Sequence, residues 1–230
     1  MLTLGFVRAR SLSVLVLAIL ALGSGSVEAP AAAVAAEGEP EFTASVARIG
    51  ADLRERMTGS SWHEGCPVGF SDLRVITLRR IGMDGDAHRG RLVVHRDQAT
   101  RIVRVMRRLF EVRFPIQRMW LIDRYGGSDA RSMARNNTSA FNCRYVSGTT
   151  RWSQHAYGRA IDVNPIQNPY VSGSHVSPEA GERYADRSLT EPGMIHRGDA
   201  VVRAFRANDW TWGGNWSGAK DYQHFSRTGG

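Results

Sequence analysis

The sequence predicts a single α+β domain, with a mainly antiparallel sheet and flanking helices. Runs with the two-residue alternation of strands are mixed with segments whose apolar residues recur every three or four positions. These patterns do not alternate regularly, as they would in a parallel α/β fold. The chain has 230 residues, 42% of them hydrophobic, and no visible repeat, which suits one domain with its own core.

The N-terminal 36 residues have the features of an export signal. Arg8 and Arg10 precede an apolar run, and small residues at 34–36 form a cleavage site. The run is shorter than the roughly 20 residues of a membrane span. We therefore expect residues 1–36 to be removed, leaving a secreted, wall-associated protein without stable membrane insertion; a retained anchor is the alternative.

After the signal, residues 37–41 form a flexible lead-in and residues 42–230 the folded domain. Helical spacing predicts an amphipathic helix from Phe42 to Met57. Alternation of apolar and polar residues then predicts strands at 73–77 and 92–94.

The middle of the domain starts with a helix that has Asp97 as its predicted N-cap and ends before Pro115. Shorter elements follow it. They are a strand at 119–122, a turn at 125–128, a helix at 128–135 and a strand at 140–143.

The last third contains a long segment, 164–197, that is rich in Pro, Gly, Ser and Asn and lacks periodicity. Loops of this length are often functional. Asp199 opens a further helix, and Trp210 and Trp212 lead into a closing strand around 222–225.

The formal charge is +8, which favours anionic partners. No nucleic-acid-binding motif is present, so we expect no nucleic-acid partner. The arginines are scattered singly or in pairs, which favours solvated faces over a dedicated polyanion site. We expect a monomer.

Cys66 and Cys143 are the two cysteines of the chain. In an exported protein they indicate a disulfide, because cysteine zinc sites normally use closely spaced pairs. Free buried thiols are the alternative. A bridge would close a loop of more than seventy residues.

Two short segments concentrate residues that can bind a metal. The first runs from Ser153 to Asp162 and contains His155; the second contains Asp221 and His224. Two imidazoles and one carboxylate suit zinc and leave a position open for water, while a second carboxylate can move a proton. By spacing alone, a His-x6-Asp pair is more often a pair of surface residues.

The local sequence places these side chains on different elements. Gly158 and the β-branched Ile161 and Val163 argue against a helix. We therefore expect His155 in a loop, a turn at Gly158, and a strand on which Ala160 and Asp162 share one face.

Together the two segments match the pattern S-x-H-x-x-G-x-A-x-D followed by an acidic residue three before a histidine. This pattern resembles the zinc D-alanyl-D-alanine carboxypeptidase family, which includes vancomycin-resistance carboxypeptidases and phage L-alanyl-D-glutamate endopeptidases. The resemblance covers roughly residues 90–226. It implies the zinc-peptidase fold that is also found in Hedgehog-type domains.

The resemblance implies a role for each matched residue. His155, Asp162 and His224 would bind Zn²⁺, Asp221 would act as general base and then acid, and Ser153 would bind substrate. The family also places an arginine near the metal, after a Gly-Tyr-Arg-like turn. Residues 123–127 have no arginine in that place.

Arg144 is the substitute candidate for this catalytic arginine, with Arg131 behind it; a structural role for either is equally open. His175 and His196 lie in or near the long segment and are candidates for lining a groove. Among the tryptophans, Trp152, Trp212 and Trp216 flank the motifs, so one of them could pack against substrate.

The expected function is an exported zinc metallopeptidase that hydrolyses peptidoglycan stem peptides next to a D-amino acid. The alternative is a zinc-stabilised cell-wall binding module without peptidase activity. A weaker alternative is a basic wall protein that binds polyanions and whose zinc site is vestigial.

Overall fold

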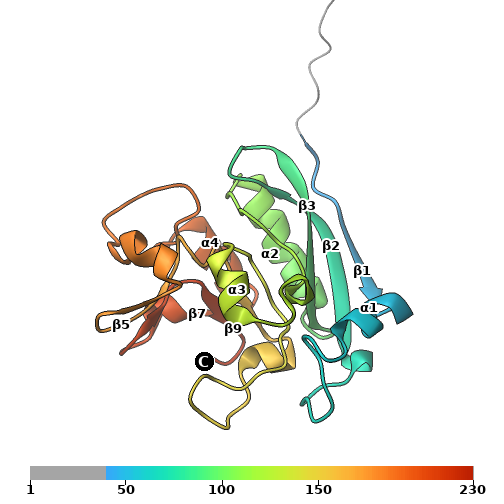
Figure 1. Ribbon diagram of the computed structural model, residues 1–230. Helices are drawn as coiled ribbons and strands as arrows, with labels where there is room; N and C mark the ends of the chain where they lie inside the picture. The colour runs from blue at the N-terminus through green and yellow to red at the C-terminus, as the bar shows by residue number, and fades with distance from the viewer. Residues whose placement is uncertain (1–39, 230) are drawn as a thin grey trace, which may run out of the picture. The chain divides into compact units, whose positions relative to one another are not determined.

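The computed structural model describes residues 40–229, which belong to one compact unit. The predicted signal, residues 1–36, and most of the predicted lead-in lie outside the described residues. Within 40–229, no helix is both long and apolar enough to cross a bilayer. The predicted α+β class is confirmed, since three small antiparallel sheets are combined with short helices (Figure 1).

The first sheet has the order β1-β2-β3 and is antiparallel throughout. β2 (Leu73–Ile81) and β3 (Ala87–His95) form a hairpin, which confirms both predicted strands and extends them. β1 (Ala44–Arg48) pairs along the free edge of β2. The two faces of this sheet bury different cores.

The predicted helix from Phe42 to Met57 is wrong in its first half, because β1 occupies it and α1 (Ala51–Met57) begins only after Gly50. Val46, which the helical stripe would bury, is 45% exposed. Pairing with the edge of β2 satisfies the backbone of this segment, so tertiary structure overrides the local spacing.

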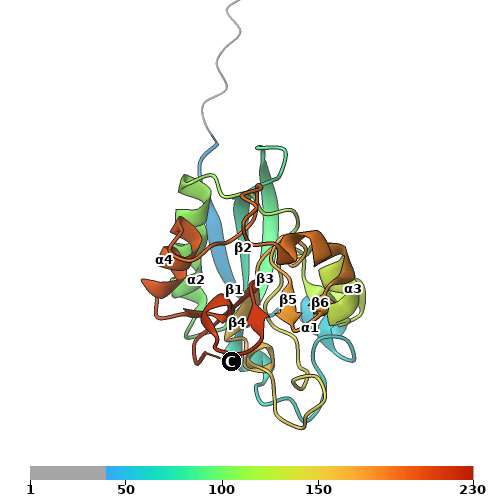
Figure 2. The same cartoon turned by 90° about the vertical axis from the view of Figure 1, so that its left-hand side faces the viewer.

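One face of the sheet packs against α2 (Ala99–Glu111), and α4 (Ala200–Arg206) packs against α2 (Figures 1 and 2). Asp199 caps α4 by accepting a hydrogen bond from the Val202 N–H, as predicted. Asp97 does not cap α2: the N-cap is Gln98, and the Asp97 carboxylate instead pairs with Arg159.

Two predicted strands are irregular in the structure. Residues 119–122 and 140–143 both approach β3, but through single hydrogen bonds and not a ladder. The Arg91 N–H donates to the Met119 carbonyl, and the Phe141 N–H donates to the Val93 carbonyl. The two segments therefore contact one strand at different points without forming strands themselves.

The other two sheets are small and are formed by strands between residues 160 and 226. One has the order β4-β9-β7 and the other β6-β5-β8. The long segment 164–197, which lacks periodicity in the sequence, contains regular structure: the β5–β6 hairpin and a 3-10 helix. The bounds are β4 Ala160–Asp162, β5 Tyr170–Ser172, β6 His175–Ser177, β7 Thr211–Trp212, β8 Lys220–Asp221 and β9 His224–Ser226.

The remaining helices are short. α3 (Asp129–Ala134) confirms the predicted helix after the turn at 125–128. The 3-10 helices are η1 Phe70–Asp72, η2 Ile122–Tyr125, η3 Gln154–Tyr157, η4 Glu179–Ala185 and η5 Gly213–Asn215.

An aromatic stack joins the first sheet's core to the C-terminal strands. Phe205 of α4 stacks on Phe225 of β9 with 3.8 Å between ring centroids, and both side chains are fully buried. Trp210 and Trp212 are also buried. Because β9 is packed in this way, residues on it are held rigidly.

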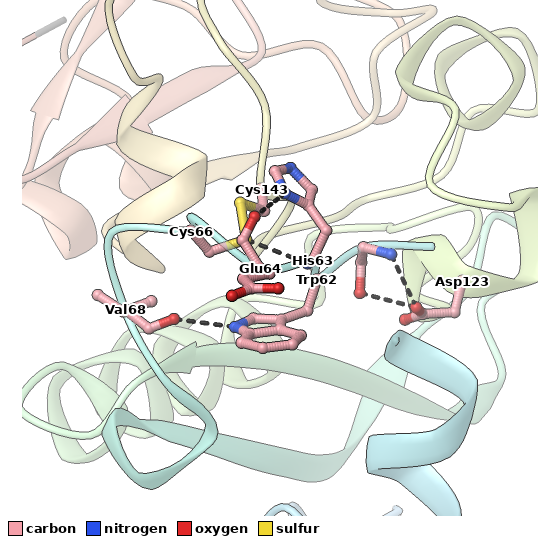
Figure 3. The surroundings of a disulfide bond; sticks show 8 residues. Trp62, His63, Glu64, Cys66, Val68, Asp123 and Cys143 are labelled. Carbon is pink, nitrogen blue, oxygen red and sulfur yellow. Dashed lines mark hydrogen bonds between the residues drawn. A yellow bond between two sulfur atoms is a disulfide. The ribbon is translucent and has the colours of Figure 1, made fainter. Parts of the chain in front are cut away.

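The Cys66–Cys143 disulfide is present (Figure 3). Its Cα atoms are 5.9 Å apart, and it ties the loop after α1 to the segment that follows residue 140. His63 lies beside the bridge. This is not a metal site, because both sulfurs are consumed in the bond.

Replacing both cysteines, Cys66→Ser with Cys143→Ser, is expected to lower the free energy of unfolding by about 4 kcal/mol, because the bridge closes a long loop in the unfolded chain. Urea unfolding of the oxidised wild type and of the double variant measures this difference. A loss below about 1 kcal/mol would contradict the chain-entropy account.

Candidate metal and catalytic site

The first motif confirms the predicted turn at Gly158 and the strand after it, while the segment of His155, predicted as a loop, is the 3-10 helix η3. Ser153 is the N-cap of η3, and its Oγ accepts a hydrogen bond from the His155 N–H at 3.3 Å. Gly158 ends η3 with φ = 63°. A Cβ at this position would lie 2.5 Å from the His95 nitrogen, so both conformation and contact require glycine.

The register of β4 against β9 brings the two motifs together. Asp162 lies directly opposite His224 in this antiparallel pair, so both side chains lie on one face of the sheet. The distance from Asp162 Oδ1 to His224 Nδ1 is 3.0 Å, and from Asp162 Oδ2 to His155 Nε2 it is 3.1 Å. One carboxylate therefore contacts both imidazoles.

Hydrogen bonding orients the His155 ring. Its Nδ1 lies 2.6 Å from the carbonyl oxygen of Ala140 and donates to it, which leaves Nε2 directed at Asp162 and His224. Ala140 belongs to the irregular segment that contacts β3. The neighbouring Phe141 is bonded to β3 and the neighbouring Ser139 to Asp162 of β4, so both sheets set the orientation of this imidazole.

The charges of the three side chains depend on one another. Burial alone would raise the pKa of Asp162, but the imidazoles, His155 foremost, hold that pKa far below its usual value. Burial lowers the pKa of His155, and the Asp162 carboxylate more than offsets this and raises it. The ionised carboxylate of Asp162 thus favours a positive charge beside it in this cluster.

The donor set of these three residues fits zinc. His155, Asp162 and His224 are all buried, and their ligand atoms lie within 4.8 Å of one another. The nitrogens His155 Nε2 and His224 Nδ1 face each other at 3.3 Å. Two imidazole nitrogens and a carboxylate oxygen converging in this way form the N₂O set that zinc binds.

Asp221 lies on β8, beside this cluster but not in it. Gly213 allows the chain to pass close to it, since a Cβ at residue 213 would lie 2.5 Å from the Asp221 carbonyl oxygen. Asp221 Oδ1 is shielded from solvent and has no hydrogen-bond partner among residues 40–229. Burial raises the pKa of Asp221 to about 7. Nearby charges oppose one another there: His224 lowers the value and Asp162 raises it.

Arg144 is held by an ion pair that the sequence did not reveal. Its Nη2 lies 2.7 Å from Oδ2 of Asp129, the first residue of α3. Both side chains line the same cleft as the His/Asp/His cluster. Arg131, the second arginine candidate, is exposed and does not line this cleft.

The cleft has a volume of about 830 Å³, which suits a peptide segment. His155, Asp162, His224, Asp221, Arg144 and Ser153 all line it, so the structure brings together every candidate from the motifs and Arg144. Of the two histidines in or near the long segment, His175 lines the cleft, whereas the His196 ring bonds to the Leu189 carbonyl elsewhere.

Two further lining residues were missed or left open by sequence reasoning. Asp129 gave no signal, because its partner Arg144 is distant in sequence. Trp216, one of three tryptophans that flank the motifs, lines the cleft with its ring centroid 5.6 Å from that of His224. Neither Trp152 nor Trp212 lines it.

Residues 147–227 match a family described as D-alanyl-D-alanine carboxypeptidase. The match confirms the resemblance predicted from the motifs, and it supports a carboxypeptidase-like peptidase. It contains all the metal-ligand and proton-transfer candidates, but it leaves residues 90–146, and with them Arg144, outside. No curated protein and no solved structure gives a significant match.

Asp221→Asn is expected to stabilise the metal-free protein at pH 8 by up to about 4 kcal/mol, because it removes the cost of ionising a desolvated carboxyl whose pKa is about 7. The unfolded carboxyl ionises near pH 3.8 and the folded one only near 7, so this group destabilises the fold progressively between these values. The gain should therefore vanish below about pH 4. Thermal unfolding in the presence of a chelator, from pH 4 to pH 8, measures it; an equal gain at both ends would contradict the assignment.

Proposed function

We propose that this protein is an exported zinc metallopeptidase that hydrolyses peptidoglycan stem peptides next to a D-amino acid. The observation that carries the proposal is the buried His/Asp/His cluster in one peptide-sized cleft with a separate carboxylate, Asp221, whose Oδ1 has no hydrogen-bond partner among residues 40–229. The family match over the same residues supports the carboxypeptidase-like reaction. The disulfide is consistent with export.

His155, Asp162 and His224 would hold the metal. Zinc, when bound, supplies the Lewis acidity that activates a water molecule and polarises the peptide carbonyl. The carboxylate among the ligands lowers the net positive charge of the site relative to three histidines. The Ala140 carbonyl keeps the His155 ring in the tautomer that leaves Nε2 unprotonated for coordination.

Asp221 would accept the proton of the attacking water and then deliver it to the departing amine. Its Oδ1 has no partner within residues 40–229, so no hydrogen bond must be broken before it takes a proton. The pKa of about 7 suits a group that must both accept and release a proton near neutral pH.

Arg144 would stabilise the negative charge that develops on the carbonyl oxygen. Asp129 holds its guanidinium group in the cleft through one nitrogen, Nη2. Ser153 would bind the substrate's peptide or carboxylate group from the cleft wall. Its Oγ is already fixed by the His155 N–H, so the hydroxyl has a defined position.

His155→Ala is expected to abolish zinc binding and activity together, whereas Asp221→Ala should keep zinc and lower turnover by on the order of 10²- to 10⁴-fold. Mass spectrometry of muropeptides, with and without a chelator, measures activity, and metal analysis measures zinc. His88→Ala, at a histidine outside the cleft, is the control and should retain both.

Retained activity in either site variant would refute this mechanism. Wild-type protein that binds zinc and peptidoglycan but releases no product would instead favour the binding-module alternative. The position of the cleaved bond, read from the product masses, identifies the substrate class.

Arg144→Gln is expected to lower kcat/KM by on the order of 10²- to 10³-fold, because a charged donor to the developing oxyanion is lost. Arg131→Gln removes an arginine that does not line the cleft and should change kcat/KM less than about threefold. The same loss in both variants would assign the effect to net charge and contradict the role given to Arg144.

A further inference from the structure

A second cavity, of about 590 Å³, lies between α1, β3 and the irregular segment before η2. It shares no lining residue with the catalytic cleft. Four arginines line it, against a single carboxylate, Asp123. They are Arg56 of α1, Arg89 and Arg91 of β3, and Arg124 of η2. The fold thus brings four positively charged side chains from distant parts of the sequence to one cavity.

Within the part of the chain that the structure describes, the single carboxylate of Asp123 offsets only part of the charge of these arginines. The side chains of Arg56, Arg89 and Arg91 have no hydrogen bond or ion pair there. Arg91 Nε is shielded from solvent and still lacks a partner. The carboxylate of Asp123 already accepts two hydrogen bonds, from the N–H and the hydroxyl of Ser61 (Figure 3).

The charge continues along the sheet beyond this cavity. Arg89 also lines an adjoining cavity of about 360 Å³ together with Arg79. Arg79 and Arg89 are directly opposite each other in the β2–β3 pair. Like charges in this position destabilise a sheet, and an anion bound between them would remove that cost. We name the row formed by Arg56, Arg79, Arg89, Arg91 and Arg124 the arginine groove.

The single aromatic ring of the main cavity indicates what kind of anion fits. Trp120 is already covered by the Arg124 guanidinium, 3.9 Å from the ring centroid. Among the described residues, no other aromatic side chain lines either cavity, so neither offers an open surface for stacking bases. This disfavours single-stranded nucleic acid and favours a polyanion without bases.

We propose that the arginine groove binds a flexible, base-free phosphodiester polymer, of the polyol phosphate kind. Guanidinium groups match the two free oxygens of a phosphodiester by paired hydrogen bonds. Arg89 and Arg91, two residues apart on one strand, present their charges roughly 6.6 Å apart along the sheet. A flexible chain can follow arginines that come from a helix, two strands and a loop.

A synthetic glycerol phosphate octamer is the probe. Calorimetry measures its affinity for the protein without the predicted signal, residues 37–230, between about 50 and 200 mM salt. Arg56→Gln with Arg89→Gln should weaken binding at least tenfold at low salt. It should also reduce the slope of log K against log salt by about 1.4, since each lost contact to a single-stranded polyanion contributes about 0.7.

The matched control is Arg48→Gln with Arg197→Gln, which removes the same charge from exposed sites outside both cavities. It should bind within about twofold of the wild type. Unchanged melting temperatures show that both double variants are folded. Because the test measures binding, its outcome does not depend on peptidase activity.

Equal losses in the two double variants, or no loss in the first, would overturn the proposal. Tighter binding of a thymidylate octamer or of polyglutamate than of the glycerol phosphate octamer would also overturn it, in favour of nucleic acid or of a carboxylate polymer.

Discussion

The pairing of β4 with β9 is the constraint on which the site depends. It puts Asp162 opposite His224, so a shift by one residue would turn one of these side chains to the other face of the sheet. The stack of Phe205 on Phe225 prevents such a shift, because Phe225 is adjacent to His224 and fully buried. Packing in the core of the domain therefore fixes the geometry of the proposed ligands.

Burial then gives the two carboxylates different chemistry. Asp162 contacts two imidazoles and stays ionised, since their hydrogen bonds and charge outweigh the cost of desolvation. The charges of His224 and Asp162 also act on Asp221. Its Oδ1 lacks any hydrogen-bond donor within the described chain, however, and burial raises its pKa. One carboxylate is thus suited to hold a cation and the other to exchange a proton.

Sequence reasoning predicted the part of the site that depends on local structure. Gly158 and Asp162 lie within one short segment, so a turn and a strand could be assigned from residue types. It failed where tertiary contacts decide: β1 replaced half of a helix because β2 had a free edge, and residues 140–143 contact β3 without forming a ladder. Asp129 could not be found for the same reason, because only the fold brings it to Arg144.

The two halves of the cleft are therefore built by different means. The half with the proposed metal ligands rests on the strand register and the buried aromatic core, and its residues form a recognisable sequence pattern. The arginine half rests on a residue in an irregular segment, where no ladder fixes the backbone. There the Cys66–Cys143 bridge holds the residue just before Arg144, and Asp129 holds the guanidinium. A covalent bond and an ion pair substitute for regular structure there, which explains how Arg144 is held in the cleft although it lies outside the sequence pattern of the proposed ligands.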